Sequence, residues 1–137
     1  MNTVSLLKAL ADETRLRIVS LVLHGGELCA CEVEAILGVR QSNASRHLGR
    51  LVQAGLLASE KKGQWVHYSS GPLGDPAMRF VHDAVASARR ESGVFERDLD
   101  RLADYRNSGF SCRTIRAWKP RGDGKRVQKA KTPSHSA

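Results

Sequence analysis

Apolar residues recur with helical spacing in four segments of the first part of the chain. The segments cover about residues 4–10, 12–24, 32–37 and 42–54. Asp12 has the side chain of a helix N-cap, and each of the last three segments is followed by glycine, which favours a C-terminal stop. The pattern predicts four helices, of which the third is short.

The segment 42–54 has the sharpest division between its two faces. Ala44, Leu48, Leu51 and Val52 form one apolar stripe. The opposite face is polar and is expected to be exposed: Ser42, Asn43, Arg46, His47 and Arg50.

Two runs suited to β-strands follow at 57–61 and 65–69, joined by Lys62-Gly63-Gln64. They predict a β-hairpin. Helical spacing then returns at 77–90 and again around 95–102. This order of elements predicts a mainly α fold with a small β-hairpin, the winged helix-turn-helix.

The chain of 137 residues is long enough for one modest core. We expect one folded domain over 1–106 and a flexible, basic, cysteine-containing tail over 107–137, disordered from Pro120 onward. No apolar run has the length needed to cross a bilayer, and charges interrupt the N-terminus too early for a secretory signal. A soluble, cytoplasmic protein with no membrane partner is expected.

The net charge of +8 is concentrated at the C-terminus. Residues 113–137 contain eight Lys or Arg and one Asp, so the first 112 residues are close to neutral. Sequence-specific DNA binding must therefore depend on a few placed side chains, whereas the tail can add a salt-sensitive attraction to phosphate.

The helix predicted at 42–54 carries side chains that suit base edges in the major groove near its start. The predicted DNA contacts from this helix and from the hairpin tip are Gln41, Ser42, Asn43, Ser45, Arg46, His47, Lys61, Lys62 and Gln64.

Three cysteines are few for a disulfide framework but suit a soft metal site. Cys29 and Cys31 could chelate one ion, yet positions i and i+2 lie roughly 200° apart around a regular helix. The pair can converge only where the backbone is not helical, or where a bound metal distorts the first turn of the next helix.

Several motifs in order resemble the ArsR/SmtB family of metal-responsive bacterial repressors, in particular its arsenical-responsive members. They are LADETRLRI at 10–18, ELCAC at 27–31, QS at 41–42, SRHL at 45–48, GLL at 55–57 and GQWVHY at 63–68. The resemblance implies a winged-helix homodimer that pairs through the helices at 4–10 and 77–90. It also implies binding to double-stranded operator DNA, an imperfect inverted repeat, and release when metal binds.

The arsenical repressors carry a third cysteine where this chain has Glu34. Carboxylate is a poor substitute for thiolate toward trivalent arsenic, which leaves Cys112 as the remaining sulfur. The adjacent Arg113 is expected to favour its thiolate. We predict a site of Cys29, Cys31 and Cys112 for As(III) or Sb(III), with no cofactor needed for DNA binding.

Two alternatives stay open on the sequence alone. A cadmium- or lead-responsive repressor of the same family would use the same sulfurs, and a redox repressor would oxidise Cys29 or Cys31. An enzyme such as a thiol-dependent arsenate reductase is not expected, because the sequence has no phosphate-binding loop and no paired base for a thiol.

Overall fold

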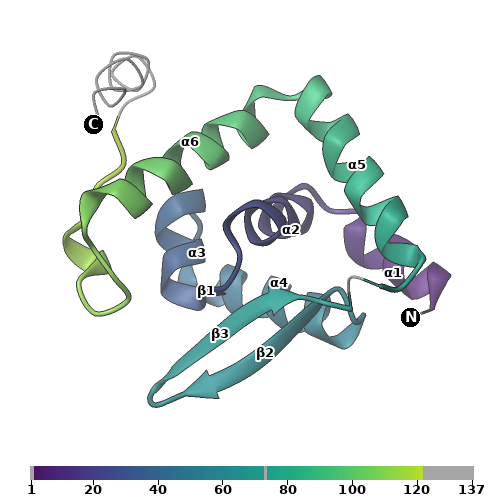
Figure 1. The fold of residues 1–137 in the computed structure, drawn as a ribbon, viewed down its shortest axis with the longest axis horizontal. Coiled ribbons are helices and arrows are strands. Elements are labelled where there is room, and N and C mark those ends of the chain that lie inside the picture. The colour runs from purple at the N-terminus through teal and green to yellow at the C-terminus, as the bar shows by residue number, and fades with distance from the viewer. Residues whose placement is uncertain (1, 73, 122–137) are drawn as a thin grey trace.

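The computed structural model describes residues 2–72 and 74–121, and in these residues six α-helices pack together with a small sheet at one edge of the molecule (Figure 1). The helices are α1 Thr3–Leu10, α2 Glu13–Gly25, α3 Ala30–Leu37, α4 Gln41–Gln53, α5 Ala77–Glu91 and α6 Gly93–Ser108. Each predicted helix is present. The last one extends well beyond its predicted range, because its second half is polar on the exposed side.

Side chains at the helix starts account for several of these bounds. Asp12 is the N-cap of α2 and accepts a hydrogen bond from the Arg15 N–H at 3.0 Å. Gly38 ends α3 with a φ of 73°, a left-handed conformation that glycine adopts without strain. This turn sets α3 and α4 as the two helices of a helix-turn-helix.

The sheet is antiparallel, with the strand order β1-β3-β2. The strands β2 Leu57–Lys62 and β3 Trp65–Ser70 form the predicted hairpin, which is the wing. The third strand, β1 Leu28–Cys29, pairs with β3 so that Cys29 lies opposite His67. A strand of two residues leaves no alternating pattern, and the sequence did not predict it.

Helix α2 runs through the middle of the molecule and the other helices are arranged around it (Figure 1). Ile18 and Leu21 on α2 are fully buried, as are Leu48 and Leu51 on α4 and Ile36 on α3. Burial of this shared core fixes the recognition helix α4 against α2 and α3. No helix within the described residues is long and apolar enough to span a membrane.

After α6 the chain turns at Gly109 and folds back toward α3, where it forms a short 3-10 helix, Ile115–Ala117. We call residues 109–121 the C-terminal strap. Ile115 and Trp118 are 4% and 5% exposed and belong to the hydrophobic core. The predicted division at 106/107 therefore falls inside α6 and does not coincide with a break in packing, because two apolar side chains hold the strap. The disorder predicted from Pro120 lies almost wholly outside the described residues.

Candidate metal centre and nucleic-acid interface

Cys29 and Cys31 lie where β1 changes into α3. Cys29 is the N-cap residue of α3, with φ −89° and ψ 165°, and Cys31 is in the first helical turn. This extended-to-helical change points both side chains to the same side, and their Sγ atoms are 2.9 Å apart. The backbone thus provides the non-helical start that the spacing of the pair requires.

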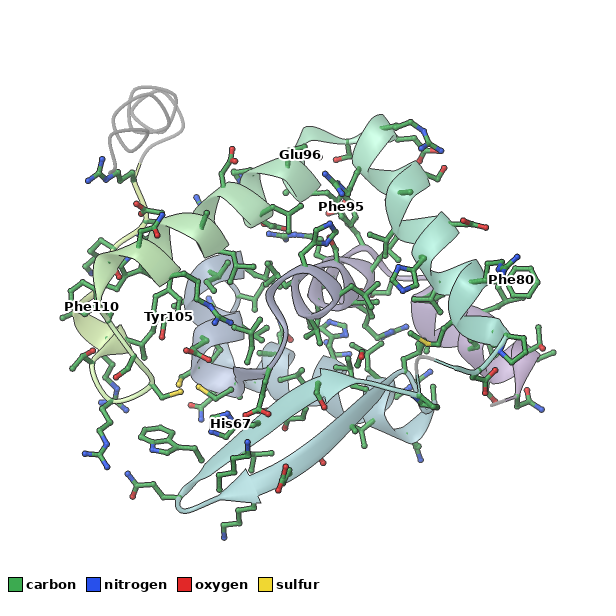
Figure 2. The ribbon with its side chains drawn as sticks, in the orientation of Figure 1. His67, Phe80, Phe95, Glu96, Tyr105 and Phe110 are labelled. Atoms are coloured by element: carbon green, nitrogen blue, oxygen red, sulfur yellow. The ribbon has the colours of Figure 1, made fainter. Side chains whose placement is uncertain are left out.

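The C-terminal strap brings Cys112 to the same place. The three Sγ atoms all lie within 4.8 Å of one another, and the Cys31 Sγ is 3.9 Å from the carbonyl oxygen of Cys112. The sulfur atoms lie together between the start of α3 and the strap (Figure 2). Three thiols at this separation can supply three sulfur ligands to one thiophilic ion.

Burial controls the protonation of this cluster. It raises the pKa of the Cys29 thiol above its ordinary value, and contacts with the other two thiols raise the pKa further. Burial also raises the pKa of Cys112. The expectation that Arg113 favours a Cys112 thiolate is therefore wrong. The Arg113 side chain is exposed, and desolvation of the sulfur dominates.

A hydrogen-bonded group connects the thiols to α6 and the strap. Glu32 accepts a hydrogen bond from the Cys29 N–H at 2.9 Å and another from the Tyr105 hydroxyl. The Tyr105 ring meets the Trp118 ring edge to face, with centroids 5.4 Å apart. Glu32 therefore couples the start of α3 to the element that carries Cys112.

Sequence reasoning missed this group. The spacing of Cys29 and Glu32 matches a capping box, a local signal that was available. Tyr105 and Trp118 are far away in the sequence, and no local pattern connects them to Glu32.

Glu34, at the position where the family resemblance implies a third cysteine, lies beside the thiols. It lines a cavity together with Cys31, Cys112 and Arg116. Burial raises the pKa of the Glu34 carboxyl, and the positive charge of Arg116 opposes this rise. Within the described residues, the group suited to a metal consists of the three cysteines without this carboxylate.

Most of the predicted DNA-contacting residues are exposed on α4 and at the wing tip. Those are Gln41, Ser42, Asn43, Ser45, Arg46, Lys61, Lys62 and Gln64. The Asn43 side chain accepts a hydrogen bond from Arg46 at 3.1 Å, which holds the guanidinium over the first turn of α4. Lys62 forms an ion pair with Glu27 at 2.8 Å. The geometry leaves polar side chains exposed on both elements that a winged helix presents to DNA.

The expected exposure of His47 is wrong. Its side chain is only 6% exposed, and its Nδ1 is 3.2 Å from the Arg15 guanidinium. His47 lies three residues after Ala44 and beside Leu48, so it belongs to the buried stripe of α4. Burial lowers the pKa of the imidazole, an effect that the nearby Asp12 opposes.

Comparisons with known proteins agree with this geometry. The family described as "Bacterial regulatory protein, arsR family" matches residues 12–59. The chain is 49% identical over 99 residues to the arsenical resistance operon repressor of Escherichia coli strain K12; the match covers 72% of this chain and 85% of that protein.

Two solved structures have the same fold. The HlyU protein of Vibrio cholerae has 36% sequence identity and a TM-score of 0.52, covering 60% of this chain and 89% of that one. The antimony-specific transcriptional repressor AntR has 28% identity and a TM-score of 0.55, covering 65% of this chain and 78% of that one.

Proposed function

The chain belongs to the ArsR family of bacterial regulatory proteins, and on this premise we propose that it is a transcriptional repressor that arsenite or antimonite releases from operator DNA. The observation that carries the proposal is the gathering of Cys29, Cys31 and Cys112 at the junction of β1, α3 and the C-terminal strap. The repressor names of the Escherichia coli relative and of AntR support the choice of As(III) or Sb(III). No cofactor takes part in DNA binding.

The chemistry of the effector suits buried, protonated thiols. Arsenite is an uncharged trihydroxide at neutral pH. Each thiol sulfur replaces one hydroxide on arsenic, and the displaced hydroxide takes the thiol proton and leaves as water. Three arsenic–sulfur bonds form, three arsenic–oxygen bonds break, and three waters are released. No charge change accompanies the exchange, so a desolvated site is not penalised for holding the product.

The position of the thiols provides the route to the DNA-binding elements. Cys29 pairs with His67 on β3, a strand of the wing. Cys31 lies in α3, which is joined to the recognition helix α4 by the turn at Gly38. Drawing the three sulfurs onto one ion shifts the start of α3 and the edge of the sheet together. An effector that binds this altered state more tightly than the DNA-binding state weakens DNA binding. Bound DNA weakens effector binding by the same coupling free energy.

The repressor acts as a homodimer. Val4 and Leu7 on α1 and Phe80 on α5 are 60%, 56% and 64% exposed, which is unusual for large apolar side chains. Both helices lie at the end of the molecule opposite the strap, where Phe80 points outward (Figures 1 and 2). A two-fold dimer through this face presents two α4 helices to an imperfect inverted repeat.

The proposed contacts with DNA are the exposed residues of α4 and the wing tip. Gln41, Ser42, Asn43, Ser45 and Arg46 meet the major groove, and Lys61, Lys62 and Gln64 meet the adjacent backbone or minor groove. His47 is left out because its side chain is buried.

The experiment that tests the function measures release of a labelled duplex as arsenite is added. The duplex is one that the wild-type chain selects from random-sequence DNA. Arsenite and antimonite are expected to release the wild-type protein, and Cys29→Ser or Cys31→Ser to abolish release while DNA binding persists. Unchanged release in Cys112→Ser would remove that residue from the site.

The same assay decides between the alternatives. Release by cadmium or lead but not by arsenite would make the chain a divalent-metal sensor. Release by peroxide in metal-free buffer, reversed by a reductant, would make it a redox repressor that uses the close Sγ atoms of Cys29 and Cys31.

A further inference from the structure

The C-terminal strap places two arginines beside a groove that reaches the start of α4 and the wing tip. A cavity of about 700 Å³ opens at this point. Its wall includes Gln41 at the start of α4, Gln64 and Trp65 at the wing tip, and Arg113 and Arg116 on the strap. Residues of α3, α4, the wing and the strap therefore border one open groove, which is the cavity that Cys31 and Glu34 also line.

A winged helix that places α4 in the major groove and its wing in the neighbouring groove must straddle one phosphate backbone. That backbone passes between the first turn of α4 and the hairpin tip, which is the position of this groove. Phosphate contacts from Lys and Arg fix the register of such proteins on the duplex.

The two arginines suit this role in charge and exposure. Both side chains are exposed, and within residues 2–72 and 74–121 neither forms an ion pair. Arg116 has Glu34 as an acidic neighbour, and its positive charge acts to lower the pKa of that carboxyl. Neighbouring Ile115 is buried and anchors the backbone that carries both guanidinium groups.

We propose that Arg113 and Arg116 bind the DNA phosphate backbone between α4 and the wing, so that the strap is a third DNA-contacting element. The inference rests on the proposed function, because it requires that the chain bind DNA. It adds a direct connection between effector and DNA: Cys112 and Arg113 are adjacent, so a strap drawn toward arsenic displaces a phosphate ligand.

The test compares Arg113→Gln/Arg116→Gln with wild type on the selected duplex across a series of salt concentrations. The slope of log affinity against log salt falls by about 0.9 for each phosphate that the protein no longer neutralises, hence by roughly 3 to 4 for both arginines in a dimer. Arg113→Lys/Arg116→Lys keeps most of the slope. Arg106→Gln, an exposed arginine on α6 outside the groove, leaves it unchanged.

Two outcomes overturn the inference. One is an unchanged salt slope in the double glutamine variant, and the other is tighter DNA binding by that variant, which would mean that the strap obstructs the groove. Absorbance from arsenic–thiolate bonds checks that each variant still binds arsenite. If wild type binds no selected duplex, the proposed function fails; if wild type binds and releases normally but the variant matches it, only this inference fails.

Discussion

Arg17 on α2 and Asp98 on α6 form a buried ion pair between positions 81 residues apart in the sequence. The Arg17 Nε donates to one carboxylate oxygen at 2.8 Å and Nη2 donates to the other at 2.9 Å, while Nη2 also reaches the Leu37 carbonyl oxygen at 3.1 Å. The Asp98 hydrogen bond raises the pKa of Arg17, so the guanidinium stays charged in the buried pair. It fixes α6, and through α6 the C-terminal strap, against the helix-turn-helix.

Removing Asp98 is expected to destabilise the fold strongly. Asp98→Ala leaves the Arg17 guanidinium buried without its counter-charge, which costs about 3 to 5 kcal/mol of unfolding free energy in comparable pairs. Glu96→Ala is the matched control, because Glu96 is also on α6 and its removal breaks only an exposed ion pair with Arg89 on α5, worth about 0 to 1 kcal/mol. Urea denaturation of both variants measures the difference; equal decreases in stability would contradict the role given to the buried pair.

Loosening the strap is expected to weaken arsenite binding more than DNA binding. Trp118→Ala removes the edge-to-face contact with Tyr105 and a buried aromatic surface, so Cys112 is no longer held beside Cys29 and Cys31. We expect the arsenite affinity to approach that of Cys112→Ser. Trp118→Phe keeps the aromatic contact and serves as the control. Titration by thiolate absorbance gives the affinities, and wild-type affinity in Trp118→Ala would show that the strap is held by other contacts.

The pH dependence of effector binding is expected to differ between arsenite and cadmium. The pKa values of Cys29 and Cys112 are raised, so both groups are protonated thiols at neutral pH. Arsenite exchanges hydroxide for thiolate without net proton release, whereas Cd²⁺ must displace up to three protons. Between about pH 6 and 8 the arsenite affinity should stay nearly flat, and the cadmium affinity should rise as pH rises. A steep rise of the arsenite affinity with pH would contradict binding of arsenite to protonated thiols.

The raised pKa values of the thiols also determine the direction in which the stability of the fold changes with pH. The folded state favours the protonated thiol, so the stabilisation is present below the ordinary cysteine pKa of about 8.5 and is lost as pH rises toward the higher folded pKa. Cys29→Ala should reduce this alkaline destabilisation. Thermal denaturation from pH 7 to 10 checks it, and an identical pH profile in the variant would contradict the assignment.

A charge on the exposed apolar face is expected to separate the dimer. Phe80→Glu places a carboxylate in the proposed α1/α5 interface, and desolvating it would disfavour association. His82→Glu, also exposed on α5, is the control. Sedimentation velocity should give monomer for the first variant and dimer for the second. A Phe80→Glu variant that stays dimeric would mean that another surface forms the interface.

Much of the architecture was predictable from local pattern. The periodicity of α2 and α4, the glycine after α3 and the runs that flank Lys62-Gly63-Gln64 predicted the bounds of the helix-turn-helix and the wing to within two residues. These features are local, because a helix or a hairpin is specified by neighbours in sequence. The exposed face of α4 was also predicted, apart from His47, whose place at the edge of the apolar stripe the periodicity did not resolve.

The sequence by itself determined the family, the helix-turn-helix with its wing, and the pair Cys29 and Cys31. Only the tertiary structure decided that the pair converges at a strand-to-helix junction, that Cys112 joins it, and that Arg113 and Arg116 border the groove beside α4. The reason is physical. The strap is positioned by the Arg17–Asp98 pair and by Trp118 packing on Tyr105, contacts between residues distant in the chain that leave no periodic trace in its sequence.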